Sequence, residues 1–296
     1  MGIKYSIGIA TTKNENGIII NMLKSLKEDI GSANIKSFEI LICLNNYNRE
    51  TEKELLGIAK LNPSMNIKLL KSKPGLIPAQ RKLIKCSRSS SDFIIFYDSD
   101  VSIEKGTTQK FIKLMEKNPS VIVGTGDQEA YKEKGFWYNT YNIVGLIPKL
   151  MSKRKYIIGR CFAIRKDKYF VPDPVVSDDT FISSYVVYNF GKNVLKVVPG
   201  ASVKYFGPST LKDYYHKIRR ITLQKELIFS MYPEYVSLEP YFKKRWINKE
   251  IRKLPYIKRL QLFLQKRITS LCQKTVKLSK KDHWTPLTTT KNKKVF

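Results

Sequence analysis

Short apolar runs alternate with amphipathic stretches over the first 230 residues of the chain. Runs such as YSIGIAT at Tyr5–Thr11 have the length and the polar flanks of buried strands. The stretches between them place apolar residues every three or four positions, which is typical of helices packed on one face. We predict strands at residues 5–11, 39–44, 66–70, 92–97, 121–124, 157–164 and 194–198, and helices at 78–86, 107–117, 179–190 and 211–230, with two more before Pro63.

This alternation predicts an α/β fold with a mainly parallel, Rossmann-like sheet flanked by helices. The regular pattern is lost between residues 127 and 151, and the composition changes beyond Pro240. There, apolar residues share one helical face on either side of Pro255, among many basic residues. We therefore predict a domain at 1–230 and a basic amphipathic helical C-terminal extension at 231–296, whose last residues are disordered. The stripe after Pro255 contains Leu260, Leu264, Ile268, Leu271 and Leu278.

The chain carries 54 Lys and Arg residues against 25 Asp and Glu residues, a net charge of +29. Residues 241–296 contribute +15 of this charge, so half of the excess lies in the last fifth of the chain. Such a segment favours a polyanionic partner: nucleic acid, an anionic membrane surface or a phosphorylated substrate. The apolar stripes favour the membrane surface, although a basic helix packed on the preceding domain would show the same pattern.

The cysteines and the hydropathy of the chain indicate which classes of protein are not expected. The four cysteines are widely separated and the two histidines have no metal-pair spacing, so neither a disulfide framework nor a zinc site is predicted. No apolar run reaches the roughly 20 residues of a transmembrane helix, and the N-terminus lacks the pattern of a secretory signal. We expect a cytoplasmic protein that is peripheral at the inner face of the cell membrane.

Two acids follow the most apolar predicted strand. Asp98 and Asp100, separated by Ser99, come directly after FIIFY. Ligands of open α/β sheets bind beyond the carboxyl ends of the strands, and two carboxylates held there suit a divalent cation that also takes diphosphate oxygens. Asp and Ser also form simple turns after strands, so this motif alone leaves both interpretations open.

Four blocks, taken in order, resemble the inverting family-2 glycosyltransferases, whose nucleotide-sugar-binding fold is called GT-A. IATTKNENGIIINMLKSL is similar to the family's opening strand, loop and helix, and KPGLIPAQRKLIKCSRSSSDFIIFYDSDV to its Gly, Ala-Arg-Asn and Asp-x-Asp stretch. GRCFAIRKD resembles its acceptor-side glycine and basic strand, and SDDTFISSYVVYNFGKNVLKVVPGASVKYFGPSTL its Glu-Asp block with the following helix and strand. The resemblance covers roughly three-quarters of the chain and implies a GT-A catalytic domain at 1–230.

The resemblance also implies a donor site. Asp98 would face the ribose and share in metal binding, and Asp100 would bind the Mn²⁺ or Mg²⁺ that bridges the nucleotide diphosphate. Arg81 is displaced by one residue from the family's arginine, where this chain has Gln80, and is expected to reach the diphosphate. Thr11, Lys13 and Glu15 match positions that hold the nucleoside, and Asn45 and Asn46 stand where the family usually has Asp to recognise the base.

The family's catalytic base is the second acid of its Glu-Asp pair, which here is Asp178-Asp179. The resemblance therefore implies that Asp179 removes a proton from the acceptor hydroxyl as its oxygen attacks the anomeric carbon. Asp178 stands where the family has Glu and is expected to help bind the donor. The other interpretation is that both acids cap the helix that follows, and the two roles are compatible.

The segment HKIRRI lies where processive family members have Gln-x-x-Arg-Trp. Lys217 and Arg220 fit the Gln and Arg positions, but Ile221 replaces Trp, which favours transfer of a single sugar over polymerisation. Arg219 and Arg220 would neutralise the diphosphate, unless they belong to a solvated basic helix face.

The sequence therefore predicts a metal-dependent inverting glycosyltransferase that uses a nucleotide-diphosphate sugar. Its expected acceptor is a hydroxyl or phosphate of a lipid-linked or cell-envelope glycan, and an anionic membrane surface is its expected partner. A nucleic-acid-binding protein is the main alternative, but the chain has no recognisable nucleic-acid motif. A nucleotidyltransferase on a related fold is the other, and IATTKNENG is a poor match to a Gly-rich phosphate loop.

Overall fold

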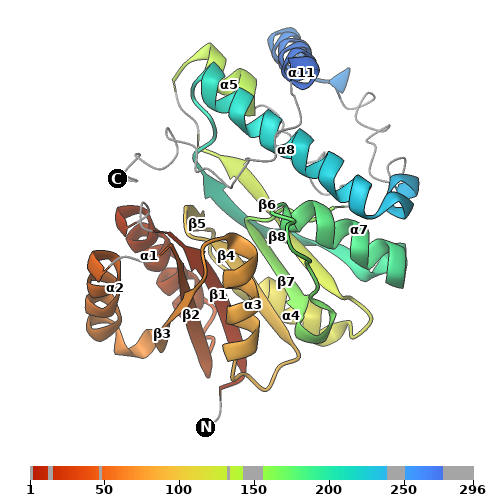
Figure 1. The fold of residues 1–296 in the computed structure, drawn as a ribbon. Helices are drawn as coiled ribbons and strands as arrows, with labels where there is room; N and C mark the ends of the chain where they lie inside the picture. Colours follow the sequence, from red (N-terminus) through yellow and green to blue (C-terminus); the bar gives the residue numbers. More distant parts are fainter. Residues whose placement is uncertain are drawn as a thin grey trace.

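The computed structural model describes residues 3–12, 16–46, 49–131, 134–142, 156–238 and 251–275. Within them one eight-stranded sheet runs in the order β3-β2-β1-β4-β7-β6-β8-β5, with helices on both faces (Figure 1). The strands are β1 Tyr5–Thr11, β2 Phe38–Asn45, β3 Ile67–Ser72, β4 Phe93–Asp98, β5 Val101–Ile103, β6 Val123–Ala130, β7 Cys161–Arg165 and β8 Leu195–Tyr205. The longer helices are α1 Asn16–Ser32, α2 Arg49–Leu61, α3 Leu76–Cys86, α4 Thr107–Lys117, α5 Phe136–Asn142, α7 Asp178–Phe190, α8 Leu211–Met231 and α11 Tyr256–Thr275.

The predicted α/β fold with a mainly parallel sheet is confirmed. Strands β3, β2, β1 and β4 pair in parallel, as does β6 with β8. Strand β7 is antiparallel to both of its neighbours, β4 and β6, and so joins these two parallel groups. Each strand and helix predicted within residues 1–230 has a counterpart within a few residues, but β5 and α5 were not predicted, and β6 and β8 are longer than expected.

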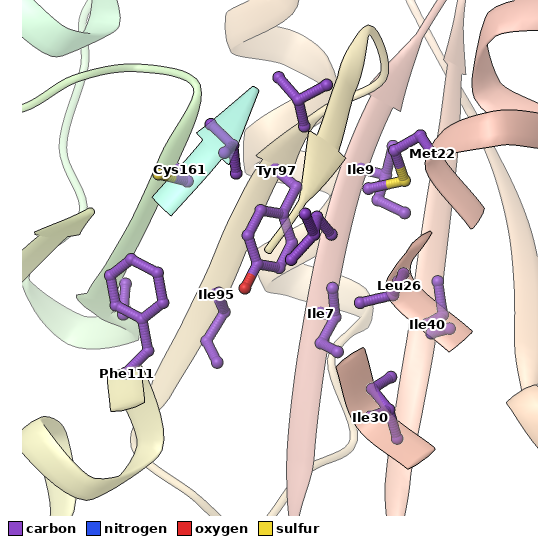
Figure 2. Packing of buried hydrophobic residues seen from close by; sticks show 14 of the residues in the cluster. Ile7, Ile9, Met22, Leu26, Ile30, Ile40, Ile95, Tyr97, Phe111 and Cys161 are labelled. Carbon is purple, nitrogen blue, oxygen red and sulfur yellow. The ribbon is translucent and has the colours of Figure 1, made fainter. Parts of the chain in front are cut away.

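The sheet is buried on both faces because successive residues of each strand point to opposite sides. Ile7 and Ile9 of β1 face α1, where they pack with Met22, Leu26 and Ile30 (Figure 2). Between them Gly8 faces the other side, where an added Cβ would lie 2.9 Å from Cε1 of Phe96. On that side Phe96 belongs to a second core, which contains residues of α3 and α7. With both faces covered, polar groups that must meet a ligand can lie only at the ends of the strands.

The helix α11 packs with one face on the rest of the molecule, beside α5 and α8 (Figure 1). The hydroxyls of Tyr214 and Thr269 lie 2.7 Å apart, and Gln265 Nε2 donates to the carbonyl of Tyr141 at 3.2 Å. The helix begins directly after Pro255, as predicted. Its predicted stripe is only partly covered: Leu260 is 39% and Leu271 63% exposed and Leu264 and Ile268 are half-buried, whereas Leu262 and Cys272, outside the stripe, are buried. The division at residue 230 stays a prediction, and residues 239–250 and 276–296 lie outside the described part.

Arg165 at the end of β7 ties the sheet to the end of α4. Its guanidinium donates to the carbonyls of Val121 at 2.8 Å and of Met115 and Asn118 at 3.1 Å, and it pairs with Asp92. The side chain is only 9% exposed, so its loss would leave buried carbonyls without donors.

We expect Arg165→Met to lower the free energy of unfolding by about 3 kcal/mol, because several buried hydrogen bonds are lost together. Asp92→Asn is the matched control: the Asp92 side chain is 66% exposed, so we expect a loss of about 1 kcal/mol or less. Chemical denaturation measures both. Similar small losses in the two variants would show that the guanidinium does not hold these elements together.

Candidate active site

A cavity of about 560 Å³ opens at the carboxyl ends of β1, β2 and β4, between the sheet and the helices α7 and α8. All four acids that the sequence singled out line it: Asp98 at the end of β4, Asp100 just after it, and Asp178 and Asp179 at the start of α7. Parallel strands end on the same edge of a sheet, which is why residues far apart in the chain meet here. Ala10, Asn45, Gln128, Gly159, Arg160, Lys217, Arg220, Ile221, Gln224 and Lys225 also contribute to the lining.

Asp179 is oriented through only one of its carboxylate oxygens. Oδ1 accepts hydrogen bonds from the hydroxyl of Ser177 at 2.8 Å and from the backbone N–H of Thr180 at 2.7 Å. Oδ2 lies on the side of Gly159, where a Cβ would approach it to 3.7 Å. Among the described residues no hydrogen bond to Oδ2 is present. The carboxylate is therefore fixed in direction while one oxygen stays available to a ligand.

Asp178 is buried and belongs to a chain of side chains that passes through Gln80 of α3 to Tyr169. Gln80 Nε2 donates to Asp178 Oδ2 at 2.6 Å, and the hydroxyl of Tyr169 donates to Gln80 Oε1 at 2.7 Å. Burial and the neighbouring charge of Asp179 raise the pKa of Asp178 to about 7, although the Gln80 hydrogen bond favours the ionised form. At neutral pH the pair therefore carries less than two full negative charges.

The structure brings together some of the predicted donor-site residues and not others. Arg81 on α3 turns away, because its guanidinium contacts the carbonyl of Val171 and lies 3.3 Å from the Asp173 carboxylate. Arg219 and Thr11 do not line the cavity, and Asn46 is exposed with a φ of 60° next to the lining residue Asn45. Lys13 and Glu15 lie outside the described residues.

Four basic residues line the cavity together with the acids: Arg160, Lys217, Arg220 and Lys225. Burial opposes the charge of Arg160, but the influence of Tyr205 and of the carboxylates of Asp100, Asp98 and Asp179 outweighs it and raises the pKa. Burial lowers the pKa of Lys217 to about 7, and repulsion from both arginines adds to this effect. Burial and Arg160 also lower the pKa of Arg220.

Sequence reasoning did not find Gln80 or Arg160 as site residues. Gln80 was noted only as a departure from an arginine, whereas it holds the carboxylate of Asp178 98 positions away. Arg160 lay inside the block GRCFAIRKD, but its stacking on Tyr205, with Cζ 3.9 Å from the ring centre, joins two strands that are distant in sequence. Both residues lie inside blocks that resemble the family, and this position in the sequence was the available signal.

The acids fit a divalent cation that shares its ligands with a substrate. The described residues contain no group of three or more His, Cys, Asp or Glu side chains placed to hold a metal alone. Asp98 and Asp100 would supply two carboxylates, and Mg²⁺ or Mn²⁺ in nucleotide enzymes commonly takes one or two carboxylates together with substrate phosphates. This donor set suits a metal that binds with its nucleotide.

A mainly parallel sheet with an Asp-x-Asp turn at its edge and an acid pair at the start of a nearby helix is the arrangement expected of a GT-A fold. The sequence matches the family described as glycosyl transferase family 2 over residues 8–170, more than half of the chain, and the protein belongs to this family. It is therefore a glycosyltransferase. No curated protein sequence matches the chain significantly.

Several solved structures share the fold. One is a mannosyltransferase from Pyrobaculum calidifontis in complex with GDP-Man and Mn²⁺, with a TM-score of 0.64 and 10% identity over 93% of this chain and 88% of the other. S. aureus TarS 1-349 in complex with UDP has a TM-score of 0.51 and 17% sequence identity, and the match covers 91% of this chain and 81% of the other. Glucosyl-3-phosphoglycerate synthase from Mycobacterium tuberculosis, in complex with Mn²⁺, UDP-Glc and phosphoglyceric acid, has a TM-score of 0.51 and 12% sequence identity. This match covers 77% of this chain and 79% of the other. At these identities the likeness establishes the fold.

The raised pKa of Asp178 predicts how stability depends on pH. An aspartate in an unfolded chain has a pKa of about 4, so between about pH 4 and pH 7 the folded state binds a proton at Asp178 that the unfolded state does not. Its contribution to stability is thus present at low pH and is lost as the pH rises toward 7. Asp178→Asn keeps an oxygen for Gln80 and removes this titration.

As the pH rises from 4.5 to 7, we expect the free energy of unfolding of the wild type to fall more steeply than that of Asp178→Asn. The difference in slope should reach up to about 1.4 kcal/mol per pH unit. Denaturant titrations at a series of pH values measure both slopes. Because other titrating groups are common to the two proteins, identical slopes would mean that Asp178 is ionised throughout this range.

Proposed function

We propose that the protein is a metal-dependent, inverting glycosyltransferase that moves a single sugar from a nucleotide-diphosphate sugar to an acceptor hydroxyl or phosphate. The observation that carries this proposal is the cavity that Asp179, with Oδ2 available, lines together with Asp98 and Asp100. Family membership supports it, as do fold relatives solved with GDP-Man, UDP or UDP-Glc, two of them with Mn²⁺.

In this proposal Asp98 and Asp100 hold the donor end of the reaction. Asp98 and Asp100 would bind Mn²⁺ or Mg²⁺, with Asp98 also facing the ribose and Asn45 the base. A divalent metal there supplies positive charge that stabilises the departing nucleoside diphosphate. Arg220 adds a cation to the lining of the same cavity. Arg81 and Arg219 would need to move before they could contact the diphosphate.

Asp179 Oδ2 would accept the proton of the acceptor hydroxyl as that oxygen bonds to the anomeric carbon and the bond to the diphosphate breaks. Attack from the face opposite the leaving group inverts the configuration. Ser177 and Thr180 fix the direction of the base through Oδ1, and the buried Asp178, largely protonated near neutral pH, limits the negative charge beside it. Ile221 in the lining, where polymerising relatives are expected to have Trp, supports single transfer.

We expect Asp179→Asn to lower kcat at least about 10³-fold and to leave nucleotide-sugar binding within a few-fold, because only the proton acceptor is removed. Asp100→Ala should instead abolish the Mn²⁺-dependent part of nucleotide binding. Thermal shift with a panel of nucleotide sugars identifies the donor, and transfer and binding assays then separate the two variants. An NMR spectrum of the product gives its anomeric configuration; retention, or full transfer by Asp179→Asn, would contradict the proposal.

We further propose that α11 holds the enzyme on an anionic membrane at the inner face of the cell membrane, close to a lipid-linked or cell-envelope acceptor. Its outer face exposes Tyr256 (75%), Ile257 (60%), Phe263 (53%) and Leu271. Arginines stand over the two aromatic rings, with Arg259 Cζ 5.9 Å from the ring centre of Tyr256 and Arg267 Cζ 5.1 Å from that of Phe263. No described helix is long and apolar enough to cross a bilayer.

This combination of exposed apolar side chains and cations is typical of a helix that lies in a membrane interface. Each basic residue near an anionic surface contributes about 1 kcal/mol. The alternative that α11 packs on the catalytic domain is compatible with it, because the contacts with Tyr141 and Tyr214 use the opposite face of the helix.

We expect the triple variant Ile257→Ser, Phe263→Ser and Leu271→Ser to bind phosphatidylserine-containing vesicles about tenfold or more weakly, since it loses inserted apolar area but keeps the charges. The matched control replaces Leu56, Leu61 and Val236, also exposed, with Ser. Vesicle sedimentation measures both. Equal binding by the wild type and the α11 variant would contradict membrane docking through this face.

A further inference from the structure

The segment that leads into α7 has no regular structure of its own. Residues 175–177 belong to neither a helix nor a strand, and α7 begins at Asp178, the first residue of the acid pair. The backbone N–H groups of such a segment need acceptors from other parts of the chain, because no sheet or helix provides them. The acceptor that they find determines how firmly the start of α7, and with it Asp179, is held.

Gln224 of α8 provides that acceptor. Its Oε1 accepts hydrogen bonds from the backbone N–H of Val176 at 2.9 Å and from that of Ser177 at 3.4 Å. The side chain lines the cavity but is only 7% exposed, so two hydrogen bonds hold a buried amide in one orientation. Loss of such an acceptor is costly, because it leaves two backbone donors without a partner in a largely buried place.

Ser177 joins this anchor to the candidate base. A serine before a helix usually accepts a hydrogen bond from a backbone N–H of the first turn, but the Ser177 side chain accepts none. Its hydroxyl instead donates to Asp179 Oδ1 at 2.8 Å. A path from Gln224 to the carboxylate of Asp179 therefore consists of two hydrogen bonds and one intervening residue.

The other acid of the pair is held separately, by a second buried glutamine on another helix. Gln80 of α3 donates to Asp178 Oδ2 at 2.6 Å. Gln80 thus acts on a side chain of α7, whereas Gln224 acts on the backbone before it. Because Gln80 does not contact Ser177, it cannot replace Gln224 in fixing the direction of Asp179.

We propose that Gln224 is a positioning residue for catalysis, which fixes the backbone of Ser177 so that its hydroxyl sets the direction of Asp179. The inference rests on the proposed function, in which Asp179 is the base. A displacement of about 1 Å in a catalytic arrangement can lower a rate about 100-fold, so a small movement of Ser177 has a measurable effect. Donor binding, which the proposed function assigns to Asp98 and Asp100, does not depend on this path.

The test measures turnover of a nucleotide sugar with water as a common acceptor, after thermal shift with GDP-mannose, UDP-glucose and related compounds has identified the donor. The water oxygen bonds to the anomeric carbon, Asp179 takes its proton, and the nucleoside diphosphate leaves with the electrons of the broken bond. We expect Gln224→Met to lower kcat about tenfold or more while donor affinity stays within about threefold. Gln224→Glu keeps an oxygen for the two N–H groups and should recover most of kcat.

A matched control and a double-mutant cycle separate this role from a general structural one. Gln261→Met removes another buried glutamine, on α11 and outside the cavity lining, and should keep the wild-type kcat. If Gln224 acts through the Ser177 hydroxyl, Gln224→Met should lower kcat clearly less in a Ser177→Ala protein than in the wild type. Hydrogen exchange of residues 176–180 should be faster in Gln224→Met than in the wild type or Gln224→Glu.

The outcomes distinguish a failure of this inference from a failure of the proposed function. A wild type that binds no nucleotide sugar, or binds one and transfers it neither to water nor to octyl glycosides or polyprenyl phosphate, contradicts the proposed function. With an active wild type, an unchanged kcat in Gln224→Met, equal losses in Gln224→Met and Gln224→Glu, or additive effects with Ser177→Ala would overturn only the inference. A loss of donor affinity that accounts for the whole effect would assign Gln224 to donor binding and overturn it as well.

Discussion

A sheet covered on both faces can carry exposed charge only at the ends of its strands, and this constraint organises the molecule. Ile7 and Ile9 face one core, while Gly8 between them leaves room for Phe96 in the other. The four acids therefore gather at one edge, where β4 ends and α7 begins. The well-packed core holds them there, because moving either element would open cavities that cost several kcal/mol.

Gathering acids in a partly buried place creates an electrostatic problem that the structure solves in two ways. One carboxyl of the adjacent pair, Asp178, holds its proton up to about pH 7, because burial and Asp179 disfavour its charge. The remaining carboxylates interact electrostatically with Arg160 and Arg220, which line the same cavity. The pair thus divides its roles: Asp178 serves as a hydrogen-bonded anchor, and Asp179 keeps one oxygen for a ligand.

The sequence predicts the elements well because each strand and each long helix has its own periodic signal. The three-residue β5 could not be found that way, since Val101–Ile103 is too short for a pattern and owes its conformation to pairing with β8. The acids of the site were predicted because they stand beside strong motifs. The residues that contact them were not predicted. Gln80 bonds to Asp178, 98 positions away, and Arg160 bonds to Gln128, 32 positions away, and a local sequence pattern does not reveal contacts over such separations.

The outward direction of Arg81 has the same physical origin. One position earlier on α3, Gln80 faces the core side and reaches Asp178, so the next residue is rotated by about 100° toward the surface and meets Val171 and Asp173. A displacement of one residue in a helix therefore changes a ligand-facing position into a structural one, whatever the chemistry of the side chain.

The helix α8 links the two surfaces that the proposals concern. Lys217, Arg220 and Gln224 recur every three or four residues on the face toward the cavity, while Tyr214 contacts Thr269 of α11. Because one rigid helix carries both sets of contacts, a membrane bound by the outer face of α11 would hold the cavity at a fixed height above the lipid.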